Sequence, residues 1–224
     1  MLEEKERRQR RQRLSSLFPD SGPLRRELYP RHCEFFAAGA THNERAFIAA
    51  NRVGKTLTAA YEATCHLTGI YPDWWAGRRF DEPTRGWAAG DTAKTARDIL
   101  QLELLGTPGD ASAQGTGMIP GELILRTTPK HGLADAIETA FIRHVPTGGT
   151  SAVNFKSYDQ GRVAFQGSAI EWGWLDEECP EEVYVETLTR TLTTRGLIML
   201  TFTPLFGLTP LVLSFLPEMA PKAT

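Results

Sequence analysis

The chain has 224 residues, of which 41% are hydrophobic and 23% charged, a balance that suits a soluble chain with a substantial core. Its formal net charge of -2 gives no strongly basic field, so any contact with nucleic acid must be local. No apolar run reaches the ~20 residues of a membrane span, and the charged N-terminus is unlike a signal peptide. Cys33, Cys65 and Cys179 are far apart without C-x-x-C spacing, which predicts free thiols in a reducing compartment.

The N-terminal segment is rich in arginine. Residues 5–13 read Lys-Glu-Arg-Arg-Gln-Arg-Arg-Gln-Arg, and the arginines surround a helix without leaving an apolar face. Two interpretations stay open: a solvated terminal helix, or an arm that binds a phosphate backbone or a partner. Residues 14–30, with three prolines and a glycine, have the composition of a linker. We therefore predict an arm and linker over 1–28 and one folded domain over 29–224.

Strand-like and helix-like segments alternate along the rest of the chain. Asp91 is expected to cap a helix over 92–105, and residues 106–121 form a long loop rich in Gly, Thr and Pro. Further helices are predicted over 57–67, 181–193 and 208–215. Strands are predicted over 46–50, 86–90, 122–126, 139–145, 152–157, 162–166, 172–175 and 196–202. The alternation predicts an α/β fold whose mostly parallel sheet carries helices on both faces.

The most informative motif is the run Ala-Ala-Asn-Arg-Val-Gly-Lys-Thr over 49–56. An apolar strand, a tight loop ending in Gly-Lys-Thr and a helix form the phosphate-binding arrangement of P-loop NTPases. Loop N–H groups and the helix N-terminus would hold the phosphates, Lys55 would reach the β- and γ-phosphates, and the Thr56 hydroxyl would bind Mg²⁺. The motif departs from the full pattern at Ala49, where the pattern has Gly. Alanine disfavours positive φ, so this position is less free than glycine to adopt the backbone that approaches a phosphate. The loop residues predicted to bind nucleotide are Asn51, Arg52, Val53, Gly54, Lys55 and Thr56.

A second acidic element follows the predicted strand at 172–175, in the run Trp-Leu-Asp-Glu-Glu over 174–178. Asp176 would stand at the carboxyl end of the strand, where ligands bind in open α/β sheets, and would hold Mg²⁺. Glu177 would act as the general base for the attacking water. The alternative is a surface acidic turn at the start of the next helix.

The apolar strand at 196–202 ends in small hydroxyl residues. Thr201 and Thr203 are candidates for sensing the γ-phosphate and coupling hydrolysis to movement. The alternative is that these threonines are ordinary β-formers at a strand end.

As a set, these motifs resemble the large terminase subunit of tailed bacteriophages, the ATPase motor that packs DNA into the procapsid. The resemblance covers about Tyr29 to Phe215 and includes Phe-Gln-Gly at 165–167, Tyr-Pro-Asp-Trp-Trp at 71–75 and Leu-Thr-Phe-Thr-Pro-Leu at 200–205. It implies a P-loop NTPase domain of the RecA/ASCE-like class that binds ATP and Mg²⁺. It also implies action on double-stranded DNA with the portal protein and the small terminase subunit, as a homo-oligomeric ring in the host bacterial cytoplasm, with no membrane.

The same resemblance implies residue roles. Arg52 matches an arginine typical of the phosphate loop of packaging motors and would contact the γ-phosphate or a neighbouring loop. Tyr29 matches an aromatic residue that binds adenine, whereas His32 stands where glutamine is common. The family uses an arginine finger from the adjacent subunit, for which Arg143 and Arg162 are candidates.

Family members continue into a nuclease domain, which uses clustered carboxylates and two metals. Because the sequence given ends at Thr224, we expect the ATPase domain alone and no nuclease activity from this chain. The alternative is a truncated prophage remnant that folds and binds nucleotide without productive hydrolysis. A helicase-like ATPase would show further Arg-rich and Gln-rich signatures after the coupling strand, and none is present.

Overall fold

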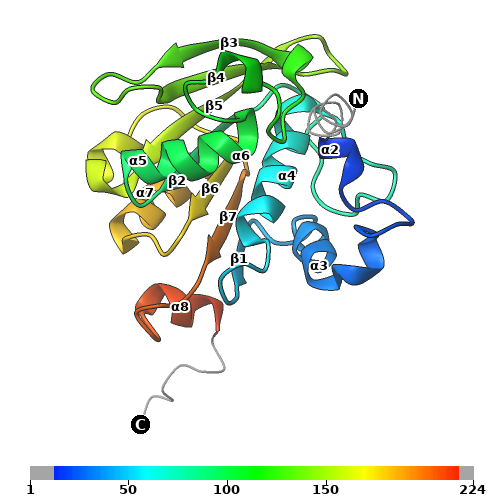
Figure 1. The fold of residues 1–224 in the computed structure, drawn as a ribbon. Coiled ribbons are helices and arrows are strands. Elements are labelled where there is room, and N and C mark those ends of the chain that lie inside the picture. The colour runs from blue at the N-terminus through cyan, green and yellow to red at the C-terminus, as the bar shows by residue number, and fades with distance from the viewer. Residues whose placement is uncertain (1–12, 217–224) are drawn as a thin grey trace.

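A computed structural model describes residues 13–216 and is built around one seven-stranded sheet (Figure 1). The strands lie in the order β1-β7-β6-β2-β5-β4-β3. In that order their bounds are Glu44–Ile48, Leu197–Phe202, Trp172–Asp176, Arg85–Gly90, Thr150–Ser157, Ile137–Arg143 and Ile124–Pro129. Most arginines of the predicted N-terminal arm lie outside the described residues, whereas Arg13 pairs with Glu103 at 2.5 Å.

Five strands, from β1 to β5 in the sheet order, are parallel to their neighbours, and the last two pairings are antiparallel. The expected mostly parallel α/β sheet is thus confirmed. β3 and β4 depart from it because a short turn over residues 130–136 joins them, and a turn of that length can join only antiparallel strands.

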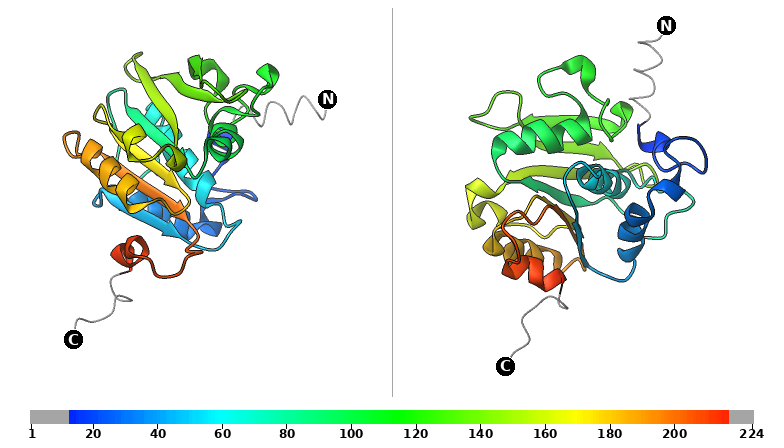
Figure 2. Two further views of the ribbon diagram at one scale, coloured as in Figure 1. Left: turned by 90° about the vertical axis from the view of Figure 1, so that its left-hand side faces the viewer. Right: turned by 60° about the horizontal axis from the view of Figure 1, so that its bottom comes forward.

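Helices cover both faces of the sheet, as Figures 1 and 2 show. The alternation of side chains along the buried strands explains why both faces need cover: Trp172 and Trp174 of β6 join one apolar cluster, and Leu175 joins the other. The first cluster packs under α3, α4 and the helix that runs from α5 to α6; the second packs under α7 and α8. The helix bounds are α2 Arg13–Ser16, α3 Pro30–Ala38, α4 Lys55–Thr68, α5 Ala93–Thr95, α6 Leu102–Leu105, α7 Glu181–Thr191 and α8 Pro210–Phe215.

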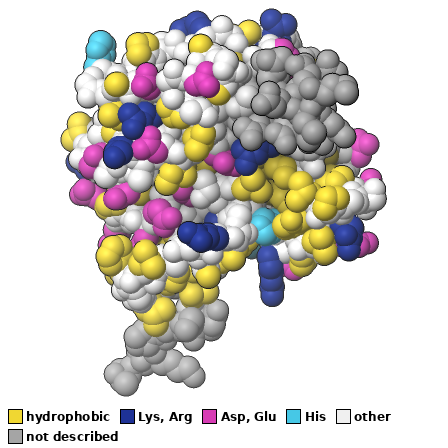
Figure 3. All heavy atoms as spheres, in the orientation of Figure 1, with side chains coloured by type: hydrophobic (Ala, Val, Ile, Leu, Met, Phe, Trp, Pro, Cys, Tyr) yellow, Lys and Arg dark blue, Asp and Glu magenta, His cyan; other side chains and the backbone are white. Residues whose placement is uncertain are grey.

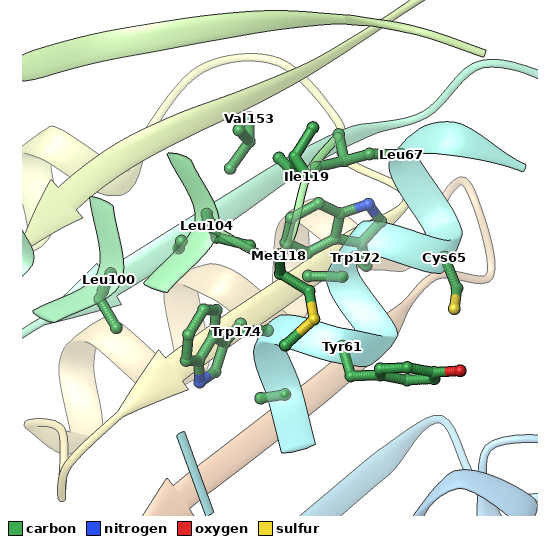
Figure 4. Close-up of a cluster of buried hydrophobic side chains, with 14 of the residues drawn as sticks. Tyr61, Cys65, Leu67, Leu100, Leu104, Met118, Ile119, Val153, Trp172 and Trp174 are labelled. Atoms are coloured by element: carbon green, nitrogen blue, oxygen red, sulfur yellow. The ribbon is translucent and has the colours of Figure 1, made fainter. Parts of the chain in front are cut away.

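The larger cluster surrounds α4. In Figure 4, Met118 of the long loop lies beside α4 and the two tryptophans of β6, and Ile119 lies near Leu67 of α4. Met118 and Ile119 are fully buried, so the loop predicted over 106–121 contributes to the core at its end. This packing fixes α4, and therefore the loop that precedes it, against the centre of the sheet.

Two local expectations were wrong. Residues 162–166, expected as a strand, form the 3-10 helix Arg162–Phe165, which buries Phe165 against Trp87. Asp91 does not cap the helix that follows it; the Thr92 hydroxyl accepts from the Thr95 N–H, and a reciprocal bond from the Thr92 N–H completes a capping box. That helix contains a π-helical segment over Ala96–Gln101.

The segment with linker composition packs against the folded domain. The Phe18 ring is fully buried and touches Tyr29, Phe36 and Tyr61 edge-on, with centroid distances of 5.6, 5.5 and 5.1 Å. Burial of an aromatic ring removes about 150–250 Å² of its surface from water, which favours the packed position of this segment despite its prolines. Figure 3 shows hydrophobic side chains gathered on this side of the molecule. Within residues 13–216, no helix is long and apolar enough to cross a membrane.

Candidate active site

The predicted site residues come together at the carboxyl edge of the parallel strands. The loop after β1 leads into α4, Asp176 ends β6, and Thr203 follows β7 directly. Because β1, β7 and β6 are adjacent and parallel, their ends meet at one edge of the sheet. Ligands of open α/β folds bind at such an edge.

The loop over 49–56 turns through two left-handed residues. Gly54 has φ 85° and precedes the first residue of α4, and Arg52 has φ 64°. Ala49 is not among the positive-φ residues, so its alanine fits the backbone that the loop adopts. A Cβ at Gly54 would lie 3.1 Å from the His32 ring, which leaves glycine as the residue that fits there.

His32, on α3, supports this loop. Its Nε2 lies 3.0 Å from the Val53 carbonyl, and burial lowers the pKa of His32, which favours a neutral ring that donates Nε2–H to that carbonyl. The Tyr29 ring stands edge-on to His32 with centroids 5.3 Å apart. The residue predicted to contact adenine is thus linked to the phosphate loop through His32.

Lys55 is buried, and its ammonium group has three oxygen acceptors. Nζ donates to the Ala49 carbonyl at 3.1 Å, the Ala50 carbonyl at 2.8 Å and the Thr203 hydroxyl at 2.9 Å. These acceptors satisfy all three donors of the ammonium. Any phosphate oxygen that Lys55 binds must therefore replace one of them.

Asp176 joins the two motifs. The Thr56 hydroxyl donates to its carboxylate at 3.1 Å, and the Thr201 hydroxyl donates at 2.6 Å. Thr201 in turn accepts from the Trp174 indole N–H at 2.8 Å. The carboxylate is therefore oriented by a chain of buried hydrogen bonds that begins in the core.

Burial raises the pKa of Asp176 to about 7; the Thr201 hydrogen bond opposes this rise, and the nearby Glu177 charge adds to it. A divalent cation would offset the cost of ionising the carboxylate. Mg²⁺ is held in such sites by one or two carboxylates together with substrate phosphates. The Thr56 hydroxyl and the Asp176 carboxylate fit that donor set. Residues 13–216 contain no cluster of three or more His, Cys, Asp or Glu that could hold a metal by itself.

Glu177 follows at the strand end with an exposed side chain and a left-handed backbone of φ 64°. Its N–H donates to the Thr201 carbonyl on β7 at 2.9 Å. Such a conformation in a non-glycine residue costs roughly 1–3 kcal/mol and persists only where the surroundings hold it.

The two threonines of the predicted coupling strand have different surroundings. Thr201 is fully buried and holds Asp176, whereas the Thr203 hydroxyl lies 2.9 Å from the Ala49 carbonyl and 2.7 Å from the Asn51 side chain. Thr203 is therefore the one that contacts the phosphate loop.

The predicted arginines are less closely grouped. Arg52 is exposed on the loop itself. Arg162 forms an ion pair with Glu186 at 3.1 Å, and Arg143 ends β4 opposite Thr150, at the edge of the sheet remote from the loop. Neither of the two finger candidates joins the site within one copy of the chain.

Two residues that contact the site were not predicted to do so. The sequence marks His32 only as a residue at a position where glutamine is common, and it gives Tyr158 no role. Tyr158 directly follows β5, and its hydroxyl donates to the Asp176 carbonyl at 2.9 Å. A polar aromatic residue at the carboxyl end of a predicted strand was the available signal.

Comparisons with known proteins show which family the chain resembles. The family model of the terminase large subunit, T4likevirus-type, N-terminal, matches residues 46–224. The large terminase subunit of Salmonella phage P22 is 36% identical over an alignment of 204 residues, which covers 84% of this chain and 41% of that protein. The chain thus spans about two-fifths of the length of that curated relative.

Among solved structures, a mutant ATPase domain of the Thermus phage P74-26 large terminase shares the fold. Its TM-score is 0.51 at 19% identity, over 74% of this chain and 61% of that one. The chain therefore shares the fold of that ATPase domain. On the family match and the P22 similarity, the chain belongs to the terminase large subunit family.

Proposed function

We propose that this chain is the ATP-hydrolysing motor domain of a phage terminase large subunit, which couples hydrolysis to translocation of double-stranded DNA into the procapsid. The observation that carries the proposal is the pairing of Thr56 with Asp176 at 3.1 Å beside the buried Lys55. This is the arrangement that a P-loop NTPase needs to hold a nucleoside triphosphate with its metal ion.

In this proposal the phosphates bind the backbone N–H groups over 51–56, and Tyr29 contacts the adenine. Thr56 and Asp176 would hold Mg²⁺, which neutralises charge on the β- and γ-phosphates. Arg52 lies on the exposed rim of the loop, where its guanidinium can contact the γ-phosphate.

Hydrolysis requires a base beside the γ-phosphate. Glu177 would accept a proton from water on its carboxylate as the water oxygen bonds to the γ-phosphorus and the bond to the ADP oxygen breaks. The exposed side chain of Glu177 is not held by packing, so its position depends on the backbone at 176–177.

Coupling would begin at Lys55. A γ-phosphate oxygen that binds Nζ competes with the Thr203 hydroxyl, which bonds Nζ at 2.9 Å. Loss of that bond would leave the Thr203 hydroxyl held only by the Ala49 carbonyl and the Asn51 side chain, and so would loosen the segment after β7, which carries the exposed Leu205 and Phe206. Thr201 would keep Asp176 oriented meanwhile.

Family membership supports the wider assembly in this proposal. The partners would be double-stranded DNA, the portal protein and the small terminase subunit. The active form would be a homo-oligomeric ring in the host bacterial cytoplasm, with a trans-acting arginine from the adjacent copy.

The proposal is tested by measuring ATP hydrolysis with and without double-stranded DNA. We expect DNA-stimulated hydrolysis by the wild type and none by Lys55→Ala, with Lys94→Ala as a control because that exposed lysine lies on α5. Nucleotide binding without hydrolysis in every oligomeric state would favour the truncated remnant instead.

A further inference from the structure

The hydroxyl of Tyr158 contacts the ends of two other strands. Tyr158 is buried, follows β5, and reaches past the end of β2 to the end of β6. Its hydroxyl donates to the Asp176 carbonyl at 2.9 Å, and the carbonyls of Ala89 and Glu177 lie at 3.2 and 3.5 Å. The hydroxyl has one proton to donate, and the Asp176 carbonyl, as the nearest of the three, is its best acceptor.

This bond closes a clamp on one peptide group. The peptide between Asp176 and Glu177 presents its carbonyl to Tyr158 and its N–H to the Thr201 carbonyl, at 2.9 Å on each side. The register of β2 with β6 ends at Ala89 and Leu175, one residue before Asp176. Tyr158 thus supplies a donor where the strand pairing has ended.

The clamp determines the conformation of Glu177. The φ of 64° at Glu177 depends on the orientation of this peptide plane, and turning the plane toward an ordinary φ would break both hydrogen bonds. Packing does not hold the side chain, because Glu177 is exposed. The direction in which its carboxylate leaves the strand is therefore set by the backbone.

We propose that Tyr158 is a positioning residue for Glu177: its hydroxyl fixes the 176–177 peptide group in the conformation from which the Glu177 carboxylate acts on water. The inference rests on the proposed role of Glu177 as the general base. It adds to the hydrolytic machinery a residue that directly follows β5, the strand two positions from β6 in the sheet.

The direct test is Tyr158→Phe, which removes one oxygen and keeps the buried ring. We expect kcat for ATP hydrolysis, expressed per nucleotide-binding site, to fall about tenfold to a hundredfold. Small displacements of a reacting group have effects of that size. KM and ADP affinity should stay within about twofold, since the phosphate loop is untouched. Tyr71→Phe is the matched control: its hydroxyl bonds the Phe80 N–H and His66, which lies near the opposite end of α4 from the phosphate loop. That variant should keep the wild-type kcat.

A double-mutant comparison separates positioning from general stability. In the Glu177→Gln background, Tyr158→Phe should reduce the remaining rate no further, because both changes remove the same function. An additional loss comparable to that in the wild-type background would overturn the inference.

Hydrogen exchange gives a readout that does not need activity. The Glu177 amide should exchange about tenfold faster or more in Tyr158→Phe than in wild type or Tyr71→Phe, because one side of the clamp is lost.

If the wild type hydrolyses ATP and Glu177→Gln does not, wild-type kcat in Tyr158→Phe overturns the positioning role alone. If the wild type is inert, the proposed function fails, and an unchanged Glu177 exchange rate would overturn the clamp independently.

Discussion

The Thr56 hydroxyl lies 3.1 Å from the Asp176 carboxylate, although the two residues are 120 positions apart in the chain. The contact joins the phosphate loop to the acidic strand end, and the Thr201 hydroxyl reaches the same carboxylate from β7. One buried carboxyl group therefore connects three adjacent strand ends.

The first prediction concerns Asp176. In Asp176→Asn we expect the affinity for ATP with Mg²⁺ to fall about 10–100-fold, because a charge-assisted contact worth about 1.5–3 kcal/mol is lost. In EDTA, the affinity of Asp176→Asn for ATP should not fall, because without Mg²⁺ the carboxylate only repels the phosphates and the amide removes that repulsion. Calorimetry with and without Mg²⁺ measures both values. Asp91→Asn is the control, because the exposed Asp91 follows β2 directly; equal losses in both variants would show that Asp176 has no specific role.

The second prediction concerns positions 49 and 54 of the phosphate loop, of which only position 54 requires glycine. Ala49→Gly should change ATP affinity less than about twofold, because Ala49 does not have positive φ and glycine adds only backbone freedom. Gly54→Ala should lower the free energy of unfolding by about 1 kcal/mol or more and weaken ATP binding, since φ is 85° and the new Cβ meets His32. Tighter binding by Ala49→Gly would contradict this account.

Much of this arrangement was predictable because local patterns encode it. The run Gly-Lys-Thr after an apolar segment determines the loop and the start of α4, and Asp176 ends a strand that is apolar on both faces. The parallel sheet follows from such strands alternating with helices.

Other features depend on tertiary contacts that the sequence pattern does not carry. The segment 162–166 has the apolar residues of a strand, yet no neighbouring strand pairs with it, and it packs instead as a 3-10 turn on Trp87. The roles of Thr201 and Thr203 differ by which neighbour each hydroxyl meets. Tyr158 and His32 contact the site from elements remote in the chain, and a single sequence gives no register between them.

The third prediction concerns a buried ion pair beneath the site. Arg45 on β1 contacts Glu62 on α4 at 2.7 and 3.1 Å, and both side chains are almost fully buried. Arg45→Met should lower the free energy of unfolding by about 3–5 kcal/mol, because Glu62 is left as an uncompensated buried charge. Arg31→Met, which removes the exposed pair with Glu34, should cost less than about 1 kcal/mol. Urea titration measures both; similar losses would refute the burial argument.

The fourth prediction is a pH dependence from His66, which bonds Glu62 and Tyr71 inside the core. Burial lowers the pKa of His66 in the folded state, so the unfolded chain takes up its proton first as the pH falls below about 6.5. Stability should therefore decrease from pH 7.5 to 5.5, with His66 contributing at most about 1.4 kcal/mol per pH unit.

Urea unfolding at both pH values checks this. His66→Gln should show a shallower decrease than the wild type, whereas His42→Gln at the exposed surface should not. An identical pH dependence in wild type and His66→Gln would mean that other groups cause the loss of stability at low pH.

The central claim is that Glu177 activates water for ATP hydrolysis at the Thr56–Asp176 site. The most direct measurement is single-turnover hydrolysis of ATP by wild type, Glu177→Gln and the control Glu181→Gln, an exposed residue in the first turn of α7. Loss of a general base is expected to slow the chemical step about 10²–10⁴-fold while ATP affinity stays near the wild-type value. Hydrolysis by Glu177→Gln at the wild-type rate would contradict the account.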